Sequence, residues 1–168
     1  DDVCVALADR HGAITYGLSA ACDVRAVDVV ATSGAFTFTI ERRGATGTYD
    51  QVGEIALPLR GLHNVTNATG VVAMALELGV AFDDIASALG RFGGVARRFD
   101  VRGIDGNATF VDDYGHLPTE IDVVLAAARA SGDGWQRVIG VFQPNRYNRI
   151  AEMWHEYAHA FTNADVVV

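Results

Sequence analysis

Apolar and polar residues alternate along much of the first 60 positions of the chain. The segments "VRAVDVVAT" (24–32) and "FTFTIER" (36–42) have the period of two that is typical of a strand with one buried face. The opening segment "VCVALAD" (3–9) also favours a strand, and "DRHG" (9–12) and "RRGATG" (42–47) favour turns. We therefore expect the first third of the chain to be rich in β-structure.

From Asn64 onward the apolar residues recur with the period of a helix. Gly79 is placed to end this helix, and Asp83 or Asp84 can cap a second one. The apolar positions are Val65, Ala68, Thr69, Val72, Ala75 and Leu76 in the first helix, and Ile85 and Leu89 in the second. The segment "GGVARR" (93–98) follows, and its two glycines favour a flexible linker. The pattern predicts a domain boundary there, between residues 1–95 and 96–168.

Predicted strands and helices alternate after the linker. The strands are "RRFDVRGI" (97–104), "ATFVDD" (108–113), "RVIGVF" (137–142) and "DVVV" (165–168), and the helices run from Pro118 to Arg129 and over 150–162. This alternation is typical of a parallel sheet with crossover helices, so we predict an α/β fold. Ligands of such sheets bind beyond the carboxyl ends of the strands.

Composition and net charge argue against several classes of function. The net charge of −8 argues against a nucleic-acid partner or an anionic membrane surface, and no apolar run is long enough for a membrane span. All 13 basic residues are arginines, which excludes a lysine-bearing phosphate loop within these 168 residues. Cys4 and Cys22 have no metal or redox spacing, and we expect reduced thiols. Both ends look cut inside elements, so we expect a piece of a longer chain.

Two polar loops follow predicted strands of the second half. In "VDDYGHLPTE" (111–120), Asp112 and Asp113 can hold a ribose hydroxyl or a metal, or they form only a polar turn before a helix. In "FQPNRYNR" (142–149), Arg146 and Arg149 suit a carboxylate or phosphate, although surface arginines are commonly just solvated. Adjacent parallel strands would bring the two loops together, which favours a binding site.

A third polar segment, "RGLHNVTNATG" (60–70), begins the first predicted helix. Its asparagines, Asn64 and Asn67, can hydrogen-bond the edge of adenine, or one of them only caps the helix. His63 lies beside them. Arg97 and Arg98 in the linker can reach a phosphate, or they are a surface pair.

The stretch "WHEYAH" (154–159) contains the His-Glu-x-x-His pattern of zinc hydrolases, His155, Glu156 and His159. Such a site needs a third protein ligand, and the only downstream candidate is Asp165. We therefore expect these three residues to form a solvated helix face, with Trp154, Ala158 and Phe161 packing inward, and we expect no metal site in this chain.

Four of these segments together resemble one family. "GLHNVTNA" (61–68), "FGGVARRFD" (92–100), "VDDYGHLPTE" and "FQPNRYNR" stand in the order and approximate spacing found in the Mur ligases. The resemblance implies that residues 1–95 are the end of a central ATP-binding α/β domain. Residues 96–168 would be most of a Rossmann-like C-terminal domain, and both domains would be incomplete. The family's phosphate-loop lysine and its Mg²⁺ ligands would precede residue 1.

The resemblance also implies a reaction. Within the family, the match is strongest to the branch that joins L-alanine to UDP-N-acetylmuramate at the expense of ATP, through an acyl phosphate, in cytoplasmic peptidoglycan precursor synthesis. The branch that recycles a tripeptide is the alternative. Neither nucleic acid nor membrane is an expected partner.

Roles follow by matching motifs. His63, Asn64 and Asn67 correspond to adenine contacts, Arg98 to a catalytic phosphate contact, and Asp113 to a nucleotide contact. Tyr114, His116, Arg146 and Arg149 correspond to positions that face the amino acid, with His116 also catalytic. The sequence departs from the family at Leu117 and Asn145, where histidines are usual, so no role of those histidines transfers.

Overall fold

The computed structural model describes residues 2–131 and 133–168. The chain divides into two compact units, residues 1–92 and 93–168. The N-terminal unit contains a four-stranded sheet of β1 (Tyr16–Gly17), β2 (Val24–Thr32), β3 (Ala35–Arg43) and β4 (Tyr49–Leu57), in that order. The first two strands are parallel and the other two pairings are antiparallel. The strands predicted at 24–32 and 36–42 are confirmed as β2 and β3.

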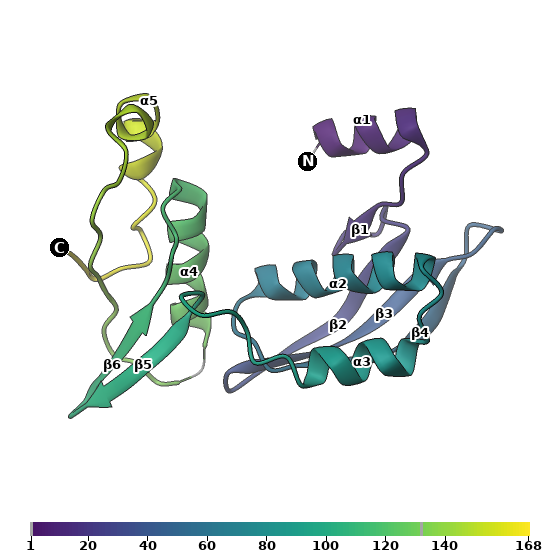
Figure 1. Cartoon of the computed structure of the whole chain (residues 1–168), viewed down its shortest axis with the longest axis horizontal. Coiled ribbons are helices and arrows are strands. Elements are labelled where there is room, and N and C mark those ends of the chain that lie inside the picture. Colours follow the sequence, from purple (N-terminus) through teal and green to yellow (C-terminus); the bar gives the residue numbers. More distant parts are fainter. Residues whose placement is uncertain (1, 132) are drawn as a thin grey trace. The chain divides into compact units, whose positions relative to one another are not determined.

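Two helices, α2 (Leu62–Glu77) and α3 (Phe82–Gly90), pack against this sheet (Figure 1). The core they share with the strands includes Val24, Phe38, Ile40, Ile55, Leu57, Val65, Val72, Ile85 and Leu89. The helical period predicted from Asn64 is confirmed, because Val65, Ala68, Thr69 and Val72 are all buried. Asp83 and Asp84 do not cap α3. Its N-cap is Ala81, and both aspartates lie in the first turn, where their charge favours the helix dipole.

The strand predicted for "VCVALAD" is wrong. These residues form a helix, α1 (Asp2–His11), in which Val3, Val5 and Leu7 are exposed. A strand requires a hydrogen-bonding neighbour, and no described strand pairs with this segment. Its alanines, leucine and arginine are good helix formers, so local propensity decides the outcome.

The C-terminal unit begins with a hairpin of β5 (Asp100–Asp105) and β6 (Ala108–Asp112), which turns at Gly106 with φ of 56°. Helix α4 (Pro118–Ala130) follows and confirms the helix predicted from Pro118. Next come β7 (Ile139–Gly140), α5 (Tyr147–Tyr157) and β8 (Val166–Val167), and β7 pairs with β8 in parallel. A small core forms around Ile121, Leu125, Tyr157 and Ala160.

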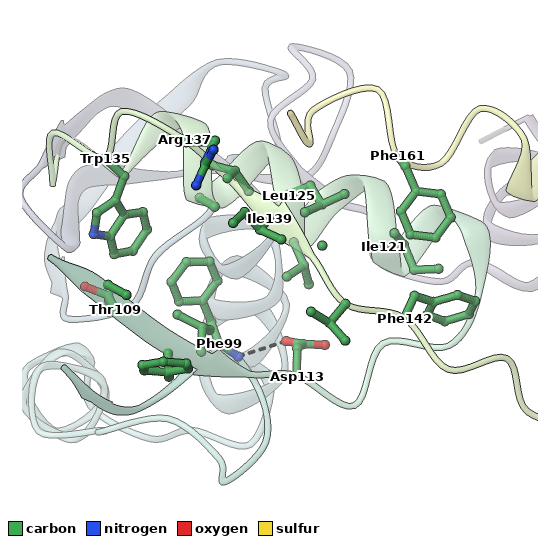
Figure 2. Close-up of a pocket in the computed structure, with 18 of the residues that line it drawn as sticks. Phe99, Thr109, Asp113, Ile121, Leu125, Trp135, Arg137, Ile139, Phe142 and Phe161 are labelled. Atoms are coloured by element: carbon green, nitrogen blue, oxygen red, sulfur yellow. Dashed lines mark hydrogen bonds between the residues drawn. The ribbon is translucent and has the colours of Figure 1, made fainter. Parts of the chain in front are cut away.

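A single parallel sheet through this unit was predicted, and the structure differs. Among the described residues, β6 pairs only with β5, and β7 pairs only with β8. A cavity of about 1160 Å³ is lined by residues of β6, α4 and the segment 134–142 (Figure 2). The mixed α/β class is confirmed, but the apolar period does not specify which strands become neighbours. No helix among the described residues is long and apolar enough to cross a membrane.

Candidate functional site

Asp113 holds the loop that connects β6 to α4. Its Oδ1 accepts a hydrogen bond from the backbone N–H of Gly115 at 2.6 Å, and its Oδ2 accepts one from the N–H of Phe99 at 2.8 Å (Figure 2). The neighbouring Asp112 forms an ion pair with Arg97 at 3.5 Å. Both aspartates therefore connect this loop to the turn at 97–99.

Glu120 closes the N-terminus of α4. Its Oε2 accepts hydrogen bonds from the N–H groups of His116 at 2.9 Å and Leu117 at 3.1 Å, which are free donors at the start of the helix. Burial favours the neutral carboxyl, but these two bonds, together with the electrostatic influence of the His116 ring and the Arg98 guanidinium, outweigh it and lower the pKa of Glu120. Glu120 is thus a charged cap that fixes the loop at 116–117.

The turn that carries Arg98 has an unusual backbone. Its neighbours Arg97 and Phe99 have φ of 60° and 48°, a region that costs a non-glycine residue about 1–3 kcal/mol. The N–H of Tyr114 donates to the carbonyl of Arg97 at 2.7 Å, and the Arg97 guanidinium lies 4.7 Å from the Tyr114 ring centre. These contacts, with the bond from Phe99 to Asp113, hold the turn in place.

The structure therefore brings Arg98, Asp113, Tyr114 and His116 together. Arg98 Nη1 lies 3.6 Å from Glu120 Oε1, and its guanidinium is 6.0 Å from the Tyr114 ring centre. The ring of His116 meets that of Tyr114 edge-on at 5.4 Å. Tyr157, from α5, donates its hydroxyl to the carbonyl of His116 at 2.6 Å. A cation, an imidazole and a phenol thus share one partly exposed surface.

Arg146 and Arg149 lie at the start of α5. Arg146 is its N-cap, with φ of 68°, and the two arginines line a shallow hollow of about 500 Å³ with Glu152. Within residues 2–131 and 133–168, neither guanidinium has a carboxylate within 4.0 Å. Neither makes a hydrogen bond, ion pair or ring contact with Tyr114 or His116. The chain nevertheless runs to the same end of the unit from β6 into α4 and from β7 into α5 (Figure 1).

His63, Asn64 and Asn67 belong to the N-terminal unit, on the first turns of α2. The N-cap of this helix is Gly61, so the alternative in which an asparagine caps it is wrong. Asn64 donates to the carbonyl of Arg60 at 2.7 Å, and Asn67 donates weakly to Asn64 at 3.5 Å. Asn67 is exposed and keeps its carbonyl oxygen available to a ligand.

The zinc pattern does not form a metal site. Helix α5 ends at Tyr157, earlier than the predicted 162, so His159 lies in the turns beyond it and does not share a helix face with His155. All three pattern residues are exposed, as predicted. Phe161 packs against the core with Tyr157 and Ala160, also as predicted, but Trp154 and Ala158 are exposed. Asp165 binds Arg129 and the N–H of Val138, each at 2.6 Å. The described residues contain no group of three His, Cys, Asp or Glu side chains placed to hold a metal.

Two residues of this site were not assigned a role from the sequence. Glu120 could have been found, because an acid at the third helical position is the signature of a capping box. Tyr157 could not, because its partner lies 41 positions away and the pattern carries no signal for that contact.

Comparison with known proteins shows which family the chain resembles. Residues 97–168 match the family described as "Mur ligase, glutamate ligase domain". The UDP-N-acetylmuramate–L-alanine ligases of Bradyrhizobium sp. (strain ORS 278) and Brucella ovis are each 43% identical over 156 residues, 92% of this chain and 33% of theirs. The chain thus spans about a third of the length of these curated relatives.

The solved structures that the chain resembles are also ligases of this kind. The UDP-N-acetylmuramate-alanine ligase of Thermotoga maritima superposes with a TM-score of 0.72 at 28% identity, over 92% of this chain and 33% of that one. A murein peptide ligase from Psychrobacter arcticus gives a TM-score of 0.62 at 25% identity, over 91% and 31%. Residues 97–168 therefore match a Mur ligase C-terminal domain, and the likeness of the chain to Mur ligases extends over 92% of its length.

Proposed function

We propose that the whole protein containing residues 1–168 joins L-alanine to UDP-N-acetylmuramate, with conversion of ATP to ADP and phosphate, in the cytoplasm. Support comes from the 43% identity to relatives that bear that name. The observation that carries the proposal is the pair Arg146 and Arg149, which have no acidic partner among the described residues and lie at the end of the unit reached by the His116 loop. Two such cations suit the carboxylate of an amino acid.

The proposed reaction has two steps. A carboxylate oxygen of the muramic acid attacks the γ-phosphorus of ATP, ADP leaves, and an acyl phosphate forms. The amino group of L-alanine then attacks the acyl carbon and loses a proton, and phosphate leaves from the tetrahedral intermediate. Such chemistry requires positioning and neutralisation of charge more than covalent help from the protein.

We assign the residues as the motifs suggest. Arg98 neutralises phosphate charge, His63, Asn64 and Asn67 contact adenine, Asp113 contacts the nucleotide, and Tyr114, His116, Arg146 and Arg149 face L-alanine. ATP in such reactions carries Mg²⁺. The described residues hold no suitable cluster of ligands, so we propose that residues outside positions 1–168 bind the metal. We also propose residues 1–95 as the end of the ATP-binding domain and 96–168 as part of the C-terminal domain.

The test uses the purified full-length protein with ATP and UDP-N-acetylmuramate. Phosphate release and the mass of the new amide are measured with L-alanine, glycine, L-serine and the tripeptide used by recycling ligases. We expect efficient turnover with L-alanine. Preferential use of the tripeptide would overturn the proposal. Residues 1–168 alone serve as a control and should release no phosphate, because they contain no lysine for a phosphate loop.

A further inference from the structure

The two oxygens of Glu120 face different partners. Oε2 accepts hydrogen bonds from the N–H groups of His116 and Leu117, in the loop that we assign to L-alanine binding. Oε1 faces Arg98 Nη1 at 3.6 Å, on the side assigned to the nucleotide. The Glu120 side chain is 29% exposed, so it is largely fixed by its surroundings. One carboxylate therefore connects the two halves of the proposed site.

The contact with Glu120 orients the side chain of Arg98. Its backbone lies in the strained turn at 97–99, but its side chain is 50% exposed. Among the described residues, Glu120 is the only acid within 4.0 Å of its guanidinium, and the Tyr114 ring is farther away, at 6.0 Å. Without Glu120, a long and flexible side chain would sample many rotamers before it met a phosphate.

We propose that Glu120 is a positioning residue that orients Arg98 toward the phosphates of the nucleotide while it fixes the loop of His116. The inference rests on the proposed function, because it takes Arg98 as a phosphate contact. Glu120 itself need not touch a substrate, and its negative charge would repel a phosphate. Its contribution is to reduce the number of orientations that Arg98 and the loop must lose on binding.

Substitution by glutamine separates the two roles. The amide oxygen of Glu120→Gln can still accept the N–H groups of His116 and Leu117, whereas its NH₂ group would face the donors of Arg98. Glu120→Ala removes both contacts. Glu120→Asp keeps the charge but draws it back from Arg98 by one methylene, and gives a second test should the glutamine variant not fold.

The experiment measures steady-state kinetics of the full-length protein with ATP and L-alanine varied in turn. We expect Glu120→Gln to lower kcat/KM for ATP roughly two- to fivefold, the range of a partly exposed ion pair, and to leave the KM for L-alanine unchanged. Glu120→Asp should act in the same direction, and Glu120→Ala should impair the use of both substrates. Glu156→Gln, an exposed acid on α5, is the matched control and should have no effect.

A double-mutant cycle decides the mechanism. If Glu120 acts through Arg98, Glu120→Gln should have no further effect on ATP kinetics in an Arg98→Ala background. An equal effect in both backgrounds, or an effect confined to the KM for L-alanine, would overturn the positioning role. A wild-type protein that does not use L-alanine would instead overturn the proposed function, so the two failures are distinguishable.

Discussion

The acidic side chains of this site form hydrogen bonds with backbone N–H groups. Both oxygens of Asp113 accept backbone N–H groups, and Glu120 accepts two more at the start of α4. The sequence predicted a polar loop here because acids next to a helix start are a local signal. It could not predict that Asp113 would accept a hydrogen bond from Phe99. Phe99 precedes β5 and Asp113 follows β6, so the contact depends on how these two strands pair.

The hydroxyl of Tyr157 offers a test at this scale. Its bond to the His116 carbonyl is short, and Tyr157 is 9% exposed. Tyr157→Phe should lower the free energy of unfolding by about 0.5–1.5 kcal/mol, because the carbonyl loses its partner. Tyr147→Phe is the matched control on the same helix, since Tyr147 is 95% exposed, and it should have no effect. Urea denaturation of both variants measures the difference, and equal stabilities would contradict the prediction.

The assignment of the arginines is tested by kinetics. A charge-assisted contact from Arg149 to the carboxylate of L-alanine is worth about 1.5–3 kcal/mol, which corresponds to roughly 10- to 150-fold in kcat/KM. Arg149→Ala in the full-length protein should lower kcat/KM for L-alanine by that factor and leave the KM for ATP nearly unchanged. Arg98→Ala should impair ATP-dependent acyl-phosphate formation first. The assignment would be wrong if Arg149→Ala raised the KM for ATP alone.

At the scale of elements, periodicity predicted what local patterns can encode. The buried positions of β2, α2 and α4 match the expected periods, whereas β3 buries Phe38, Thr39 and Ile40 in succession. Segment 3–9 was predicted wrongly because a strand also needs a neighbour. The prediction of one parallel sheet was wrong for the same reason. The turn at Gly106, rather than the apolar pattern, makes β5 the neighbour of β6.

Helix α3 packs closely on β4 at Gly53. A Cβ at Gly53 would lie 2.2 Å from Cε1 of Phe82. Gly53→Ala must displace this ring, so we expect a loss of about 1–3 kcal/mol in unfolding free energy. Gly103→Ala, in β5, is the control, because a Cβ there meets nothing within 4 Å. Thermal unfolding followed by circular dichroism tests both, and an equal effect of the two would contradict the close packing.

At the scale of the whole molecule, the described residues form two hydrophobic cores, one in each unit. The larger one joins a sheet to two helices, whereas the smaller one relies on α4, α5 and short strands. Each core is built from residues of its own unit. The glycines of the segment 93–98 predicted a linker, and the domain boundary between residues 95 and 96 stays a prediction.

Because each unit has its own core, we expect the two units to unfold in separate transitions. Both tryptophans of the chain, Trp135 and Trp154, lie in the C-terminal unit, so tryptophan fluorescence reports on that unit alone. Leu125→Ala should cost about 2–5 kcal/mol there and lower the fluorescence midpoint in urea. Ile40, with no exposed surface, lies in the other core. Ile40→Ala should cost a similar amount, shift the circular dichroism transition, and leave the fluorescence midpoint unchanged. A single transition that both variants shift equally would show that the units unfold together and that contacts between them contribute as much as either core.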